Sequence, residues 1–240
     1  MSYLFHTFLY NPLYNVFIGT IGLFPWIDAG IVVILLTILV KLILFPLSRR
    51  SVISQIELKM IQPDIDAIKI KYKNNKQEQT IKIMALYKEK GVNPFAGIFL
   101  TLIQIPILIA LYWVFYSKTG ITNINTDILY SFVHVPQHIN TMFLGLFDIT
   151  HKNTILAVLV GIGQYLQIRF TMPANKTPDG SKEGGFKEEL AKSMSTQMQY
   201  VMPIMMFFIA MSFQAVVALY LITSSVFAIG QELYVRKRLK

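Results

Sequence analysis

Long apolar stretches with almost no charge alternate with basic, polar segments along this sequence. The stretch 29–47 contains a single charged residue, Lys41. Nineteen residues in a helix extend about 28 Å, which is enough to cross the hydrocarbon core of a bilayer. Only 15% of the residues are charged and 54% are hydrophobic, whereas about 25% are charged in a typical soluble domain. The sequence therefore predicts an all-α integral membrane protein.

Five apolar stretches are predicted to span the membrane and to form a core helical bundle with a polar groove. The predicted segments are an N-terminal extracytoplasmic or interfacial segment at 1–28, spans at 29–47, 93–116, 154–170, 200–212 and 215–234, cytoplasmic segments at 48–92 and 171–199, an extracytoplasmic loop at 117–153, and a basic cytoplasmic tail at 235–240.

Two segments outside these spans also have helical patterns. Residues 3–21 are apolar, are interrupted at Asn11-Pro12, and are interpreted as an interfacial helix, with an additional span as the alternative. In the segment 48–92, apolar residues recur at helical spacing on either side of a polar sequence at 74–76. This pattern predicts a hairpin of two amphipathic helices, of which the second ends at Gly91.

The distribution of basic residues predicts the orientation in the membrane. Ten of the 22 Lys and Arg residues lie in segment 48–92, and four each lie in 171–199 and after Tyr234. The N-terminal segment has none, and loop 117–153 has two. Because basic residues collect on the cytoplasmic side, we expect the N-terminus outside and the C-terminus in the cytoplasm. This orientation agrees with five spans.

Lys41 is the most informative polar residue, because a charge within a span costs about 2.5–3.5 kcal/mol on insertion scales. Its ammonium could snorkel to the cytoplasmic interface, or it could face a hydrated cavity that Thr37, one turn away, would also line. The other polar side chains in the spans either connect helices by hydrogen bonds or line the same groove. The candidate groove residues are Lys41, Thr37, Gln104, Gln164, Tyr220, Thr223 and Ser224.

No catalytic residue, cofactor or metal site is predicted. The chain contains no cysteine, which excludes disulfides, thiolate metal sites and cysteine catalysis. The pair His134 and His138 has no carboxylate or thiolate nearby in the sequence, and we interpret it as part of a polar loop rather than a metal site. We therefore expect that the protein is not an enzyme.

Several short runs resemble the YidC/Oxa/Alb insertase family, and the similarity covers about residues 8–236. Its most specific part is the block 91–112. The runs are VKLILFPL at 40–47, QPDI at 62–65 with KYK at 71–73, GVNP at 91–94, LIQIPILIALY at 102–112 and ALY at 218–220.

The resemblance implies a groove that opens to the cytoplasm among five spans, with a cytoplasmic helical hairpin near its entrance. Substrates of the family place a polar segment in the groove and release their apolar segment along its lipid-facing side, without nucleotide or metal. Lys41 occupies the position where bacterial members carry the groove arginine, and lysine lacks the bidentate fork of arginine. Two further departures are FQAV at 213–216 in place of Phe-Pro-x-Gly, and Leu221 in place of an aromatic residue.

The resemblance implies a membrane insertase and chaperone that inserts and helps to fold integral membrane proteins, alone or with the Sec translocon. Its expected location is the plasma or inner membrane, as a multi-pass protein. Expected partners are nascent membrane proteins and the lipid bilayer, with the Sec translocon and the ribosome as further candidates and no specific nucleic acid sequence. The alternatives are a small channel or transporter, or a structural accessory protein of the translocon.

Overall fold

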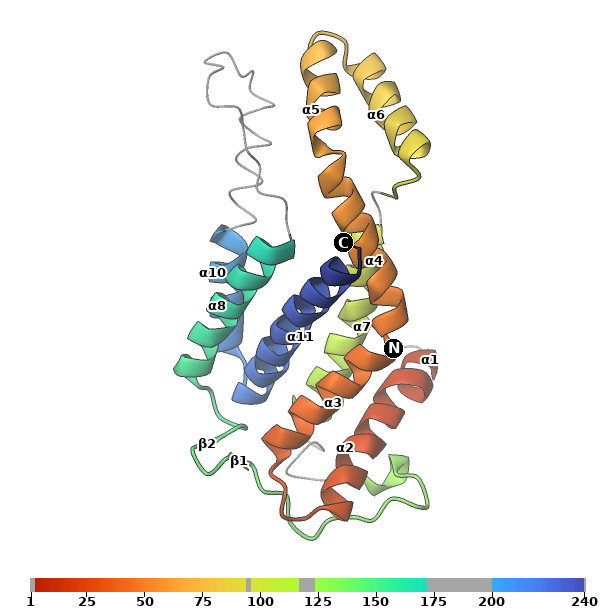
Figure 1. Cartoon of the computed structure of the whole chain (residues 1–240). Coiled ribbons are helices and arrows are strands. Elements are labelled where there is room, and N and C mark those ends of the chain that lie inside the picture. The colour runs from red at the N-terminus through yellow and green to blue at the C-terminus, as the bar shows by residue number, and fades with distance from the viewer. Residues whose placement is uncertain (1–2, 94–95, 117–123, 172–199, 240) are drawn as a thin grey trace. The chain divides into compact units, whose positions relative to one another are not determined.

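A computed structural model describes residues 3–93, 96–116, 124–171 and 200–239, with the side chains of 96–104, 116, 171 and 239 excepted. Most of these residues are helical (Figure 1). They fall into two compact units. Unit 1 comprises Met1–Ile43 and Ile105–Gly230, and unit 2 comprises Leu44–Gln104 and Gln231–Lys240.

Unit 1 begins with a continuous helical run of three parts, α1 (Tyr3–Phe5), η1 (His6–Tyr10) and α2 (Asn11–Leu23). The interruption expected at Asn11-Pro12 is instead a change from π to α winding, because a proline is tolerated in the first turn of a helix. Tyr14, Phe17 and Ile18 are completely buried within unit 1. The run therefore packs against the rest of the unit along one face.

Five helices carry the apolar sequence: α3 (Ala29–Ile43), α7 (Ala96–Tyr116), α8 (Thr154–Thr171), α10 (Met202–Ser212) and α11 (Ala215–Leu239). Among the described residues, only α11 is long and apolar enough by itself to cross a membrane, over Ala215–Arg238. The helix α3 meets this test together with the following helix, α4 (Phe45–Met60). The remaining apolar helices are shorter, at Ile105–Phe115, Thr154–Phe170 and Met202–Ser212.

The helix boundary near Lys41 differs from the predicted range 29–47. Helix α3 ends at Ile43, and α4 starts at Phe45 with Pro46 in its first turn. A proline has no backbone N–H and disfavours helical geometry in the residue before it, so it favours a new helix start over a continued helix. The last residues assigned to the first span therefore belong to the next helix.

Helices α8 and α10 lie side by side in unit 1 (Figure 1). A Cβ atom at Gly161 would lie 3.4 Å from both the Cβ of Phe207 and the backbone oxygen of Pro203. This glycine on α8 therefore permits the close approach of α10, as small residues do at helix contacts in membranes. The extended backbone of Phe213 then separates α10 from α11.

The loop 124–153 contains a short β-hairpin, which the all-α prediction did not include. Strand β1 (Met142–Phe143) pairs antiparallel with β2 (Phe147–Asp148). The loop also contains a short 3₁₀ turn, η2 (Thr126–Ile128). The backbone N–H of Val216, at the start of α11, donates to the Ile149 oxygen at 3.1 Å. The loop is therefore an ordered part of unit 1.

Helix α2 holds this loop through two side chains. Asn15 is buried, donates from Nδ2 to the Ile128 oxygen at 2.8 Å, and accepts from the Tyr130 N–H at 2.6 Å. The Tyr14 hydroxyl accepts from the Asn125 N–H at 2.8 Å. These bonds satisfy backbone groups of the loop that would otherwise need water.

Unit 2 contains α4 and the helices α5 (Gln62–Lys71) and α6 (Lys76–Lys90). The predicted hairpin is present, but its first arm consists of α4 and α5, separated at Ile61. A small core of Ile61, Ile65 and Val92 is packed by apolar side chains from both arms. No residue of α6 is fully buried, so the hairpin buries little apolar surface.

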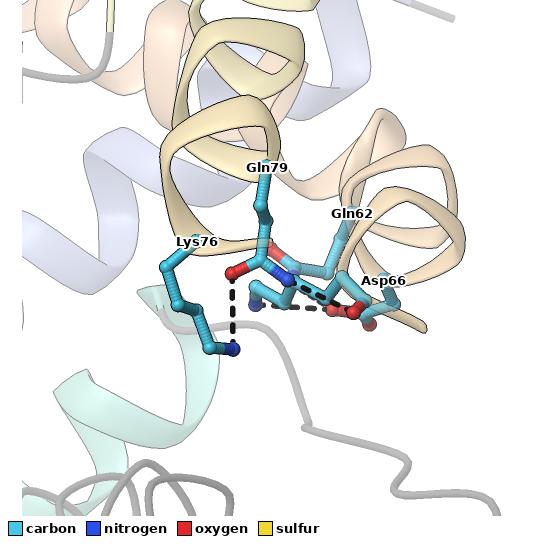
Figure 2. A network of polar contacts seen from close by, with 5 residues as sticks. Gln62, Asp66, Lys76 and Gln79 are labelled. Atoms are coloured by element: carbon cyan, nitrogen blue, oxygen red, sulfur yellow. Dashed lines mark hydrogen bonds and ion pairs between the residues drawn. The ribbon is translucent and has the colours of Figure 1, made fainter. Parts of the chain in front are cut away.

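Polar contacts stabilise each arm of the helical hairpin and connect the two arms. Within α5, Gln62 donates to Asp66 at 3.0 Å, and within α6, Lys76 donates to Gln79 at 3.3 Å. Figure 2 shows these side chains. Across the arms, Gln79 donates to the backbone oxygen of Lys69 at 2.9 Å. Gly91 ends α6 in the left-handed conformation (φ 66°, ψ 20°), as the sequence predicts.

Candidate functional site

Two candidate groove residues lie on one face of α3. Thr37 is almost completely buried and donates its hydroxyl to the Val33 oxygen at 2.7 Å, within the same helix. Lys41 follows four residues later, one turn along the same face, and is partly buried. A lysine beside a buried threonine makes this face of an otherwise apolar helix polar.

A second polar contact joins α8 to α11. The Ser225 hydroxyl donates to Gln164 Oε1 at 3.4 Å. A Cβ atom at Gly163 would lie 3.5 Å from the Ser225 Cβ, so the backbone of α8 approaches α11 closely here. Gln164 thus contacts the serine next to the predicted Ser224, and this contact connects two helices.

The three predicted residues on α11 have different surroundings. Thr223 donates to the Leu219 oxygen at 2.8 Å and is satisfied within its own helix. Tyr220 is buried at 3% exposure. Ser224 is also buried, and its hydroxyl has no hydrogen-bond partner in the described part of the chain. A buried hydroxyl in this state is a candidate for a bound water or for a polar group of a ligand.

The seventh predicted residue, Gln104, has a side chain outside the described residues. The groove that would combine α3, α7, α8 and α11 therefore stays a prediction. What the structure brings together is Gln164 with Ser225, and Thr37 with Lys41 on one helix face.

Glu232 is a buried charge that the sequence analysis did not single out, although it lies within the range predicted for the fifth span. Its side chain is 1% exposed in unit 2. Oε1 accepts from Arg236 Nε at 2.9 Å and lies 3.7 Å from Lys59 Nζ on α4. The signal available in the sequence was a lone carboxylate in an apolar helix with an arginine four residues later.

A second hydrogen bond lies next to this cluster. Gln231 Nε2 donates to the Ser48 hydroxyl at 2.6 Å, and both side chains are buried. The Phe45 ring also meets the Tyr234 ring, with centroids 6.0 Å apart. The last turns of α11 are therefore held to α4 by an ion pair, an amide and an aromatic contact, all inside unit 2.

Comparison with known proteins decides the family. The model of the 60Kd inner membrane protein family matches residues 22–240. A membrane protein insertase YidC of Clostridium tetani is 34% identical over 221 residues, which are 92% of this chain and 87% of the relative. The chain belongs to the YidC family. The membrane protein insertase YidC of Fusobacterium nucleatum is also 34% identical, over 87% of this chain and 86% of that protein.

Some YidC relatives are much longer than this chain. The membrane protein insertase YidC of Francisella tularensis subsp. novicida is 31% identical over 205 residues, which are 85% of this chain but 31% of that relative. The matched region of the family includes all five apolar helices, α4 to α6, and the β-hairpin. Family membership confirms the resemblance that the sequence runs indicated, and with it a helical membrane protein.

Proposed function

We propose that this chain is a membrane protein insertase that inserts and helps to fold integral membrane proteins. The observation that carries the proposal is the similarity to YidC insertases over nearly the whole chain, to 92% of its length. The names of these relatives favour an insertase over a channel, a transporter or an accessory protein. We accordingly propose that its substrates are nascent membrane proteins and that it is located in the lipid bilayer.

The proposed working surface is a hydrophilic groove, open to the cytoplasm, within a bundle of five spans. The polar face of Thr37 and Lys41, the contact of Gln164 with Ser225 and the unsatisfied hydroxyl of Ser224 support it. A polar segment that crosses hydrocarbon alone loses its hydrogen bonds to water at a large cost. In the groove the same segment would meet water, hydroxyls and the Lys41 ammonium, which lowers the barrier without any covalent step.

The proposed orientation places the N-terminus outside and the C-terminus in the cytoplasm. The basic residues of the helical hairpin, formed by α4, α5 and α6, and those at the end of α11 support this orientation, since Lys and Arg collect on the cytoplasmic side. The number of spans rests on the five apolar stretches of the sequence. The basic hairpin surface is also suited to capture of acidic substrates or to contact with the ribosome or the Sec translocon.

Depletion of the protein in cells tests the proposed function. Small membrane proteins with short acidic N-terminal tails are labelled, and protease added from outside reports whether the tails are translocated. We expect the tails to stay protected inside after depletion, and to become accessible again when the chain is supplied from a plasmid. Normal translocation in depleted cells, with the protein confirmed absent, would contradict an insertase function for these substrates.

Lys41 variants then test the groove. We expect Lys41→Arg to preserve insertion and Lys41→Ala to weaken it for acidic-tailed substrates by about 1–2 kcal/mol, since a hydrated groove screens the pair. Lys41→Glu should be worse than alanine, because it repels an acidic tail. Lys152→Glu, a matched charge change at an exposed lysine of the loop 124–153, is the control. If Lys41 only snorkels, Lys41→Ala inserts these substrates normally at equal expression.

A further inference from the structure

The tip of the β-hairpin is apolar and exposed. Residues 144–146 connect β1 to β2, and the side chains of Leu144 and Leu146 are 59% and 74% exposed. Hairpin connections of a membrane protein's aqueous loop are usually polar, with Asn, Asp and Gly at the tip. Two exposed leucines on either side of Gly145 therefore need an explanation other than the formation of the turn.

The backbone conformation at the tip is also unusual for a leucine. Leu144 has φ 51° and Gly145 has φ 72°, both in the left-handed region. Glycine adopts this region freely and Asn does so readily, whereas a leucine there is strained. A strained residue of this kind persists when its surroundings hold it, and such residues cluster at functional positions. Position 144 thus has a leucine although glycine or asparagine would fit this backbone conformation better.

The hairpin is firmly held at the start of α3. Asp28 is buried, accepts from the Leu144 N–H at 3.1 Å through Oδ2, and accepts from the Ile31 N–H at 2.9 Å through Oδ1. The Ala29 N–H donates to the Asn140 oxygen at 2.8 Å. One carboxylate therefore satisfies the first turn of the first apolar helix and fixes the hairpin tip beside it.

Gly30 adds a steric requirement to the same contact. A Cβ atom there would collide with the Phe143 ring. The chain just before α3 also carries exposed aromatic residues. Trp26 is 75% exposed, and its ring meets that of Phe24 at 5.5 Å. Tryptophan is enriched where a membrane protein passes from headgroups to hydrocarbon.

We propose that the hairpin tip, Leu144 to Leu146, is a membrane anchor that inserts, with Trp26, into the headgroup and acyl boundary of the leaflet in which α3 begins. Continuity with α3 identifies the occupant as lipid, because the tip is bound to Asp28, the residue directly before the apolar sequence of that span. No Lys or Arg occurs between residues 3 and 40, and the described loop 124–153 has only Lys152. The proposal rests on α3 being a span and is independent of the insertase function.

A depth measurement tests the anchor. The chain has no cysteine, so Leu146→Cys can be labelled with the environment-sensitive fluorophore NBD in the full-length protein. The labelled protein is reconstituted into vesicles of phosphatidylcholine with phosphatidylglycerol, with bromine atoms at acyl carbons 6,7 or 11,12 in separate preparations. We expect blue-shifted emission, and quenching that is at least twofold stronger with the 6,7 bromines.

Gln137→Cys is the matched control, since Gln137 is an exposed polar residue of the same loop. Its label should emit as in water and should be quenched by neither lipid. Equal emission and equal lack of quenching at positions 146 and 137 would overturn the proposal. The same result is expected if the leucines instead contact another protein, because the vesicles contain no other protein.

Leu144→Asn separates the anchor from the turn. Asn fits the left-handed conformation better and keeps the backbone N–H that binds Asp28, so the hairpin should be retained. We expect the quenching of the label at position 146 to fall at least twofold in this variant. Protection of the loop against chymotrypsin, measured on the same sample, shows whether the hairpin is intact. Unchanged quenching in an intact hairpin would exclude Leu144 from membrane contact.

Discussion

Lys59 on α4 and Glu232 on α11 lie 3.7 Å apart between Nζ and Oε1, although they are far apart in the sequence. Arg236 contacts the same oxygen at 2.9 Å, whereas the other oxygen, Oε2, has no hydrogen-bond partner in the described part of the chain. Burial removes this carboxylate from water, which costs free energy. The two nearby cations compensate that cost, so removing them would leave a buried charge without a partner.

The first prediction is that Glu232→Gln destabilises unit 2 by about 1–3 kcal/mol, since a neutral amide loses the charged contacts to Lys59 and Arg236, which are themselves partly exposed to solvent. The thermal midpoint of the detergent-purified protein reports the change. Lys59→Met should cost less, because Arg236 still compensates the carboxylate. The double variant Lys59→Met with Glu232→Gln should be less destabilised than the sum of the single changes. Strict additivity would show that the two side chains do not interact.

The second prediction concerns Asn15, which holds the loop 124–153. Asn15→Leu removes the acceptor of the Tyr130 N–H and the donor to the Ile128 oxygen, and leaves both backbone groups without a partner. Each loss costs about 1–3 kcal/mol. We expect faster cleavage by chymotrypsin at the aromatic residues of the loop. Gln137→Leu, at an exposed position, is the control and should be cleaved as slowly as the unchanged protein.

The third prediction compares two glycines that both have open space around them. Gly91 has φ 66°, whereas Gly230 lies within α11, and a Cβ at either position meets no atom within 4 Å. Gly91→Ala should destabilise the helical hairpin by about 1 kcal/mol, because the left-handed conformation is unfavourable for alanine. Gly230→Ala should stabilise α11 by about 0.8–1 kcal/mol through helix propensity. Hydrogen exchange of the α6 and α11 amides measures both, and the same sign at both positions would contradict the backbone explanation.

The fourth prediction concerns pH and Asp148. Burial raises the pKa of this carboxyl, but hydrogen bonds from Thr150 and Thr141 outweigh it, so its pKa lies below the ordinary 3.8. A carboxyl with a lowered pKa stabilises the fold above 3.8, and this contribution is lost as the pH falls through the folded-state pKa. We expect cleavage of the loop by pepsin, normalised to an unfolded peptide of the same sequence, to rise as the pH falls below 3.8.

Asp148→Asn is the control for this titration, because it keeps the shape of the side chain but does not ionise. The normalised cleavage of its loop should not change with pH over the range in which the loop of the unchanged protein opens. A pH dependence that persists in the Asp148→Asn protein would assign the titration to another group.

Several elements follow from local sequence alone. The apolar helices are predictable because their residues avoid charge over the length of a bilayer crossing. Gly91 ends α6 because glycine tolerates the left-handed cap. The family too was readable from short runs such as residues 102–112. These features depend on residues close together in the chain, which is why a single sequence reveals them.

Other elements were not predictable in this way. The start of α4 at Phe45 was missed because the apolar stretch continues across it, and Pro46 alone marks the new helix. The sequence did not predict the contacts of three buried polar residues, Asn15, Asp28 and Glu232, because each is an isolated polar residue in the sequence. Their partners are a loop, a hairpin tip and another helix that only folding brings near.

The sequence by itself determined that this is a helical membrane protein of the YidC family, because hydrophobic length and family runs are local properties. Only the tertiary structure decided which buried polar groups are satisfied, and by what. Asn15 holds a loop, Asp28 joins a helix start to a hairpin, and Glu232 is held by Lys59 and Arg236. The physical reason is that desolvation makes a buried polar group depend on a partner, and that partner is usually distant in the sequence.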